Sequence, residues 1–390
     1  MKEKALIKII GFVLISTLAI GSDQCESAQN HRFLVLEGGI LIDGTGSAPA
    51  CGAVVVISNG RIVQVGSKTK VKIPGNSKVI DVGGTTILPG FINAHVHRSY
   101  SLEKLYVWAR SGVTTVRDLA AYPPTSSFEL RDSFNKDPRA ARLVAAGPQM
   151  TAGFVPSGYP SSVFIYTVEQ ARAEAKRILK EGADQLKIML ESNLGYSDRV
   201  LSEEAAGAIV EIAHRQGKKV SAHVSLSRDI QRAINVGADD LAHMVIDKLP
   251  DDLVGKIVEA GIYWTPTLEM WQGVLSKKYL AMALDNLNRF SKASGKVALG
   301  SDYGGTYADF DLGMPMKEIQ LMHQAGMSPS DIIVSATKNA AEVCGLGNEL
   351  GTLQKGKIAD ILVTEGNPLE DLSNLTKVRL VIKSGVIIRK

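Results

Sequence analysis

The segment Leu88-Pro-Gly-Phe-Ile-Asn-Ala-His-Val-His97 carries the strongest structural signal in this sequence of 390 residues. It is a short apolar run that ends in two histidines, His95 and His97, separated by one residue. Because side chains alternate along a β-strand, both imidazoles project from the same face and can reach one metal ion. Paired histidines also occur on polar surfaces, so this pair alone leaves a metal role and a structural role open.

Short apolar runs follow this segment and alternate with helical patterns, which is typical of βα units and a parallel sheet. Start signals mark two of the helices, with Thr167 and Gln170 before one and Ser202 before another. Eight such strands predict an α/β fold, a (β/α)8 TIM barrel, with its chemistry at the carboxyl ends of the strands. The predicted strands are residues 88–95, 113–118, 142–146, 185–190, 219–223, 240–243, 262–265 and 297–300.

β-Branched runs flank the predicted barrel at both ends of the chain. Residues 33–87 contain several such runs around the turn Ser58-Asn-Gly-Arg61, and residues 350–390 repeat the pattern. We expect the first region to be antiparallel, and we expect the two regions to pair into a small β-sandwich. Residues 88–349 then form the barrel.

Composition and the first residues bear on where the protein works. The chain is 45% hydrophobic and 22% charged, and its net charge of +4 gives no sign of nucleic-acid binding. Lys2, Lys4 and Lys8 precede an apolar run, Ile9 to Gly21, that is too short to cross a bilayer comfortably. We predict a signal peptide at residues 1–21 and a secreted or periplasmic protein with no stable membrane span after cleavage. An uncleaved anchor is the alternative.

Four more residues lie in or beside predicted barrel strands. Lys187 lies inside the apolar strand 185–190, His223 and His243 end their strands, and Asp302 follows the strand 297–300. Burying the ammonium of Lys187 is costly unless it is paired with a carboxylate or neutralised, for instance by carbamylation with carbon dioxide. His223 and His243 end successive strands, a repetition that core filling explains poorly. Asp302 can reach the barrel axis as a proton shuttle, and its structural alternative is a helix cap.

At these residues the chain resembles the amidohydrolase superfamily, within it the imidazolonepropionase-like and prolidase-like branch, over roughly residues 33–390. One departure is the segment Thr151-Ala-Gly-Phe-Val-Pro-Ser-Gly-Tyr159, which has no histidine where many relatives carry Gly-Gly-His. A substrate-orienting histidine is therefore missing. The most specific parts of the resemblance are 88–97, Lys187, His223, His243, Gly300-Ser-Asp302, Ala336-Thr-Lys-Asn-Ala-Ala-Glu342, Gly356-Lys-Ile-Ala-Asp360 and Gly366-Asn-Pro-Leu-Glu-Asp371.

The resemblance implies a centre of two divalent metal ions. It assigns one ion to the first two histidines and the aspartate, a second to His223 and His243, and a bridging role to a carboxylated Lys187. Zinc is the expected metal, two ions per chain, although such ligands also accept manganese, iron or cobalt. If Lys187 stays an ordinary amine, its charge would repel the cations and a one-metal enzyme is expected.

The expected activity is metal-dependent hydrolysis of a carbon–nitrogen bond in a dipeptide or an N-acyl amino acid. Metal-activated hydroxide would attack the carbonyl, and Asp302 would carry the proton to the leaving amine. Alternatives are a lactone or cyclic-amide hydrolase and a catalytically silent exported binding protein.

Three residues are candidates for contact with the small-molecule substrate. Arg98 could meet a carboxylate, and Trp264 and Trp271 could line an apolar pocket. A structural ion pair and core packing are the respective alternatives. Whether the protein is a homo-oligomer is left open.

Overall fold

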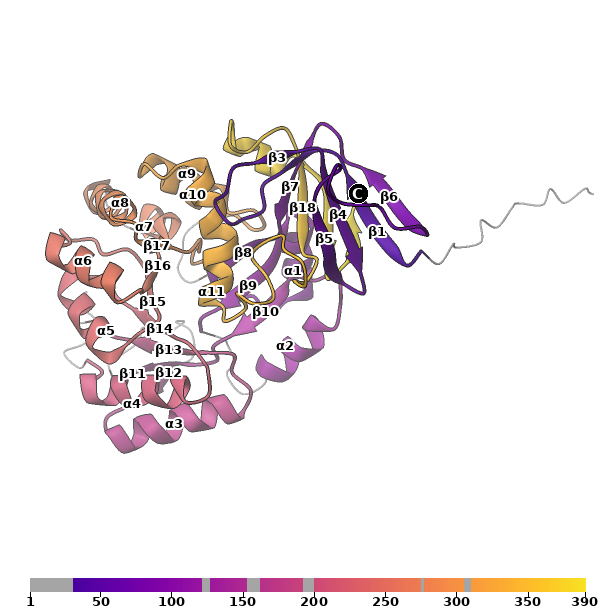
Figure 1. The fold of residues 1–390 in the computed structure, drawn as a ribbon. Coiled ribbons are helices and arrows are strands. Elements are labelled where there is room, and N and C mark those ends of the chain that lie inside the picture. The colour runs from indigo at the N-terminus through magenta and orange to yellow at the C-terminus, as the bar shows by residue number, and fades with distance from the viewer. Residues whose placement is uncertain (1–30, 121–126, 153–161, 192–199, 275–276, 305–309) are drawn as a thin grey trace, which may run out of the picture. The chain divides into compact units, whose positions relative to one another are not determined.

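The computed structural model describes residues 31–120, 127–152, 162–191, 200–274, 277–304 and 310–390; the predicted signal peptide and most of the segment 151–159 lie outside them. Parallel strands occupy the middle of the chain (Figure 1). They are β8 (Phe91–Val96), β9 (Val113–Asp118), β10 (Arg142–Ala145), β11 (Gln149–Thr151), β12 (Ser162–Phe164), β13 (Leu186–Met189), β14 (Val220–His223), β15 (Asp240–Ala242), β16 (Tyr263–Thr265) and β17 (Lys296–Val297). They form two sheets, ordered β10-β9-β8 and β12-β11-β13-β14-β15-β16-β17.

Backbone hydrogen bonds join these two sheets along both seams. On one side the N–H of Ala94 donates to the carbonyl of Leu299 at 2.8 Å, and the N–H of Asp302 donates to His95 at 2.9 Å. On the other side the N–H of Asp184 donates to the carbonyl of Ala145 at 2.9 Å. Strands β8, β9, β10 and β13 to β17 are therefore the eight strands of a (β/α)8 barrel, and the predicted fold is confirmed.

Helices follow the barrel strands. Two of them begin at the predicted caps, because Thr167 accepts the N–H of Gln170 at 3.2 Å and Ser202 accepts that of Ala205 at 3.2 Å. None of the helices in the described ranges is both long and apolar enough to cross a membrane. They are α1 (Leu102–Arg110), α2 (Ser127–Asn135), α3 (Val168–Lys180), α4 (Glu203–His214), α5 (Ile230–Val236), α6 (Asp251–Glu259), α7 (Leu268–Val274), α8 (Lys277–Lys292), α9 (Met316–Gln324), α10 (Pro329–Val334) and α11 (Ala340–Val343). Two short 3-10 helices, η1 (Ser227–Asp229) and η3 (Leu372–Thr376), and a π-helical segment, η2 (Ser335–Asn339), complete the helical elements of the described residues.

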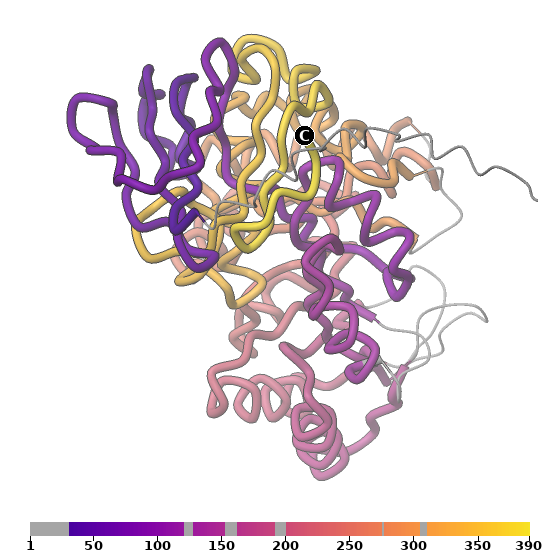
Figure 2. Tube along the Cα trace, turned by 90° about the vertical axis from the view of Figure 1, so that its right-hand side faces the viewer, coloured from indigo at the N-terminus to yellow at the C-terminus, as the bar shows by residue number. Residues whose placement is uncertain are grey.

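The two ends of the described chain pair with each other, as Figure 2 shows for the indigo and yellow segments. Their strands are β1 (Phe33–Glu37), β2 (Ile40–Leu41), β3 (Ala50–Cys51), β4 (Ala53–Ser58), β5 (Arg61–Ser67), β6 (Ser77–Asp81), β7 (Thr85–Pro89), β18 (Ile361–Glu365), β19 (Val378–Lys383) and β20 (Val386–Arg389). One sheet has the order β5-β4-β1-β6 and the other β20-β19-β18-β7-β2-β3, with an apolar cluster drawn from both. The predicted sandwich from both termini is thus present. The N-terminal region is mixed rather than antiparallel, because β1 pairs with β6 and β2 with β7 in parallel.

The predicted first strand, residues 88–95, is divided in two. Its beginning belongs to β7 in the sandwich, and β8 starts at Phe91 in the barrel. Gly90 separates them, and a Cβ atom there would overlap the side chain of Thr114. The chain therefore passes from sandwich to barrel within one residue, which fixes where β8 and its two histidines begin.

Candidate metal centre and active site

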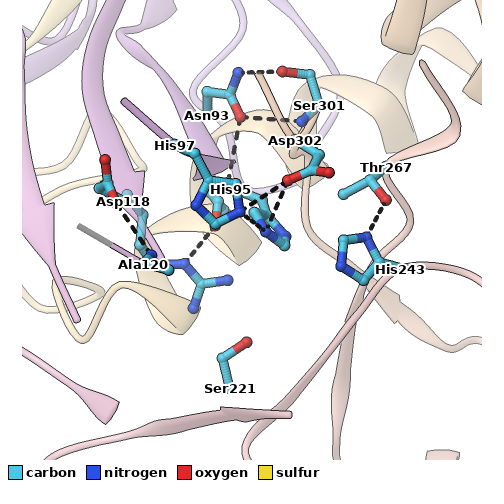
Figure 3. A network of polar contacts seen from close by, with 12 residues as sticks. Asn93, His95, His97, Asp118, Ala120, Ser221, His243, Thr267, Ser301 and Asp302 are labelled. Carbon is cyan, nitrogen blue, oxygen red and sulfur yellow. Dashed lines mark hydrogen bonds and ion pairs between the residues drawn. The ribbon is translucent and has the colours of Figure 1, made fainter. Parts of the chain in front are cut away.

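Three of the predicted ligands meet at the carboxyl ends of β8 and β17 (Figure 3). The Nε2 atoms of His95 and His97 lie 3.3 Å apart, and Oδ1 of Asp302 lies 3.2 Å from the first and 3.0 Å from the second. Two ligand atoms bound to one zinc ion at 2.0–2.2 Å lie about 3.3 Å apart at a tetrahedral angle. No described group forms a well-directed hydrogen bond to Oδ1 of Asp302, despite these distances. The three atoms are spaced as ligands of a common cation, so the residues fit a divalent metal.

The other three predicted ligands lie beside this triad. The ring of His243 is 4.9 Å from that of His95 and 4.4 Å from that of His223, measured between centroids. Lys187 is 1% exposed, and its Nζ has no hydrogen-bond partner among the described residues. The carboxylate whose charge acts most on Lys187 is Asp240, and both oxygens of Asp240 bind Arg117, at 3.0 and 2.9 Å. The structure therefore offers no carboxylate partner for the amine within the described chain.

Burial sets the protonation of this cluster. It holds the pKa of His95 and of His243 well below the usual value, with charge from Lys187 as a further cause in both. Burial likewise lowers the pKa of Lys187 to about 7. Neutral imidazoles are the form that binds metal ions, and a neutral amine is the form that can react with carbon dioxide. His95 and His243 are thus in their metal-binding form at neutral pH, and part of the Lys187 amine is neutral there.

Two polar side chains outside the predicted set orient the triad and its neighbour. Asn93 donates through Nδ2 to Ser301 Oγ at 2.9 Å, and its Oδ1 accepts the N–H of Ser301 at 3.2 Å and that of His95 at 3.3 Å. It therefore links β8 to the loop that carries Asp302. Thr267 Oγ1 lies 2.8 Å from Nδ1 of His243, which leaves the Nε2 of that ring for a ligand role (Figure 3).

Two carboxylates that the sequence analysis did not identify also contact this region. Asp118 ends β9, where it accepts the N–H and the hydroxyl of Ser99 at 3.2 and 2.7 Å. Glu191 follows β13, and its Oε2 lies 2.6 Å from Nε2 of His223. Both lie at or just after the carboxyl ends of barrel strands, so the strand-end rule that selected the histidines could have found them as well.

The three predicted substrate contacts have different surroundings. Trp264 is fully buried, packs edge-to-face on Phe290 at 5.2 Å and donates to the carbonyl of His243, which favours the core-packing alternative. Trp271 lies 5.9 Å from the ring of His243, and its Nε1 donates to a backbone carbonyl at 2.8 Å. Arg98 directly follows the second histidine and is exposed, with a φ of 50°. Trp271 and Arg98 are therefore the two that border the centre.

Known proteins resemble this chain over most of its length. The model of the amidohydrolase family matches residues 86–388. Ochratoxinase of Aspergillus niger is 26% identical in an alignment that covers 89% of this chain and 84% of that protein, and enamidase of Eubacterium barkeri is 24% identical, with 85% and 87% covered. The crystal structure of a proposed prolidase from Bifidobacterium longum gives a TM-score of 0.80 at 26% identity, covering 92% of this chain and 95% of that one. Because the family model spans more than half of the sequence, the chain belongs to the amidohydrolase family.

Proposed function

We propose that this amidohydrolase, a metal-dependent hydrolase of carbon–nitrogen bonds, cleaves the amide or peptide bond of a dipeptide or an N-acyl amino acid. The observation that carries the proposal is the convergence of His95, His97 and Asp302 beside the buried amine of Lys187, which has no hydrogen-bond partner in the described part of the chain. The names of the relatives, ochratoxinase, enamidase and a proposed prolidase, favour an amide-type substrate. A lactone or a cyclic amide is the second candidate class.

We further propose that the centre holds two zinc ions. His95, His97 and Asp302 would hold one ion, His223 and His243 the other, and a carboxylated Lys187 would bridge them. The lowered pKa of Lys187, about 7, supports carboxylation because a large fraction of the amine is neutral at physiological pH. An unmodified amine would instead place a positive charge between two cations, and the centre would then hold a single ion.

A bound divalent ion supplies a Lewis acid for the substrate carbonyl and lowers the pKa of water toward neutrality. The chain supplies the proton transfers. Asp302 accepts the proton of the attacking water and returns it to the leaving amine, as its place between two imidazoles at the end of the barrel allows. His95 and His243 do not compete for this proton, because burial keeps both rings neutral.

The substrate is held, in this proposal, by residues at the border of the centre. Arg98 would bind the carboxylate that a dipeptide and an N-acyl amino acid share, since a guanidinium matches a carboxylate in geometry and charge. Trp271 would offer an apolar wall, because the bond from its Nε1 to Met244 fixes the ring against His243. We also propose export, on the strength of the basic and apolar residues at 1–21.

Metal content and turnover of the mature protein test the function together. Protein purified with zinc and bicarbonate is assayed for zinc per chain and screened against dipeptides, N-acyl amino acids, lactones and cyclic amides. Two ions per chain with hydrolysis of the first two classes are expected. Hydrolysis confined to lactones or cyclic amides would select the second class, and stoichiometric metal without turnover would favour the exported binding protein.

A further inference from the structure

A carboxylate outside the predicted ligand set is joined to His223. Oε2 of Glu191 lies 2.6 Å from Nε2 of the imidazole, and Ser225 Oγ donates to the same oxygen at 3.3 Å. Both the carboxylate and the imidazole side chains are 11% exposed, so water screens the contact little. The backbone holds the pair in register, because the N–H of Leu190 donates to the carbonyl of His223 at 3.1 Å.

The two histidines of the proposed second metal site use opposite ring nitrogens for their protein contacts. Nδ1 of His243 is occupied by Thr267 at 2.8 Å, whereas the occupied nitrogen of His223 is Nε2. A histidine that binds a metal through one nitrogen usually donates the proton on the other to a nearby acceptor, which fixes the tautomer. Among the described residues, these contacts leave Nε2 of His243 and Nδ1 of His223 as the ring nitrogens that could bind an ion.

The geometry points to Glu191 as a positioning residue of the metal centre, one that accepts the Nε2 proton of His223 and keeps Nδ1 unprotonated. This inference rests on the metal centre of the proposed function. The carboxylate of Glu191 attracts the Nε2 proton of His223 more strongly than the neutral hydroxyl of Thr267 attracts a proton on His243. The stronger pull makes the imidazole of His223 the better electron donor of the two. His223 and His243, which would hold the second ion, thus differ in donor strength, and His223 would be the stronger ligand.

A different arrangement of protons would remove this role. If His223 carried protons on both nitrogens, its contact with Glu191 would be an ion pair that stabilises the fold and hinders metal binding. The two arrangements predict opposite effects of neutralising the carboxylate on metal affinity, so a binding measurement separates them.

The test is a cobalt titration of the metal-free protein with bicarbonate present, following visible absorption of the bound ion and competition with a chelating dye. Wild type, Glu191→Gln and Glu191→Ala are compared, with Glu174→Gln as the matched control. Glu174 lies on α3 and forms a surface ion pair with Arg177 at 2.8 Å. Glu174→Gln therefore makes the same replacement of a paired carboxylate by an amide, but at a distance from the metal centre.

We expect one of two cobalt dissociation constants to rise about 10- to 100-fold in Glu191→Gln, with the other and the control unchanged. Glu191→Ala should lose at least as much, because the glutamine oxygen can still accept the Nε2 proton. Unchanged or tighter binding in both variants would overturn the role of Glu191. A wild type that binds no stoichiometric cobalt would overturn the metal centre itself, and equal weakening of both ions with a lower melting temperature of the metal-free variants would indicate a structural role only.

Discussion

Asp302 has a backbone φ of 61°, in the left-handed region that residues other than glycine rarely adopt. The N–H of Asp302 donates to the carbonyl of His95 on β8 at 2.9 Å, which holds this residue beside the two histidines. His243, with a φ of 74°, repeats the feature in the other half of the centre. Such conformations cost about 1–3 kcal/mol each and persist where surrounding contacts impose them, which fits side chains held for chemistry.

Replacing Asp302 with asparagine keeps the shape and one oxygen of the side chain but removes its ability to carry a proton. We expect kcat to fall about 10²- to 10⁴-fold while at least one metal ion remains bound. Steady-state kinetics and metal analysis of the same preparation check this. Asp331→Asn, at an exposed helix start, serves as the control for the substitution itself. Unchanged turnover in Asp302→Asn would remove this residue from the proton path.

Gly300 is required by the closeness of two barrel strands. A Cβ atom on this residue would lie 2.8 Å from Cβ of His95 and closer still to Cγ2 of Thr265. We expect Gly300→Ala to lower the free energy of unfolding by about 1–3 kcal/mol and to weaken metal binding, because His95 must move. Denaturant unfolding and zinc content measure the two effects. Gly207→Ala on α4, where an added Cβ meets nothing within 4 Å, should instead be neutral or stabilising.

At the scale of elements, the start of α7 links the metal centre to α9. Glu318 on α9 is fully buried, and its Oε2 accepts the N–H of Glu269 in the first turn of α7 at 2.6 Å. Thr267, which contacts Nδ1 of His243, immediately precedes this turn and has a φ of 49°. The carboxyl group of Glu318 thus stabilises the backbone that presents the threonine to the histidine.

Glu318 makes the stability of the metal-free protein depend on pH. Burial raises its pKa from about 4.5 to about 8, so the folded state binds the proton more tightly than the unfolded state does. The contribution of this group to the free energy of unfolding is complete below pH 4.5. It falls by about 1 kcal/mol per pH unit as the pH rises from there to 8, and above pH 8 it is lost. Glutamine cannot ionise, so Glu318→Gln should gain stability relative to wild type by that amount per unit between pH 5 and 8. Urea unfolding of both proteins across this range tests it; parallel curves would contradict the assignment.

Local patterns in the sequence predicted most elements and singled out the six candidate residues, whereas the family resemblance supplied their assignment as metal ligands. The alternation rule explains why His95 and His97 share a face, and the apolar runs reveal the strand ends where His223 and His243 lie. The pattern could not reveal the break at Gly90, because the cause is a contact with Thr114 on the neighbouring strand. It also did not predict β11 and β12, which are only three residues long each.

The partners that orient the ligands were harder to predict for a physical reason. Thr267 contacts a ring 24 residues away and Glu191 one 32 residues away, in loops without any periodic pattern. The strand-end rule could have selected Glu191 as a candidate, but which histidine each partner contacts depends on which barrel strands become neighbours, so these contacts follow only from the assembled fold. Asn93 differs, since it lies on the same face of β8 as His95, two residues earlier, and the alternation rule already places it there.

For the molecule as a whole, the sandwich and the barrel are joined by more than the short connection at Gly90. Arg142 on β10 forms an ion pair with Asp360, just before β18, at 2.8 Å, and also donates to Thr115 on β9 at 2.9 Å. Both groups are largely buried, so this ion pair joins the barrel to the sandwich sheet in which β18 pairs with β7.

Metal binding and folding should be coupled through Lys187. Its buried amine destabilises the metal-free protein, whereas its carboxylated form would stabilise the metal-bound protein, so replacing it should affect the two states in opposite directions. Methionine has a similar length but no charge. Lys187→Met therefore removes the cost of burying an amine that has no hydrogen-bond partner among the described residues, and it should stabilise the metal-free protein. The same variant cannot be carboxylated, so it should bind one zinc ion where wild type binds two. At 100 times its dissociation constant each ion adds about 2.7 kcal/mol of stability. Thermal unfolding with and without zinc and bicarbonate should therefore show a higher melting temperature for the metal-free variant but a smaller rise on adding metal. A variant that is destabilised without metal and keeps the full rise with it would rule out the bridging lysine.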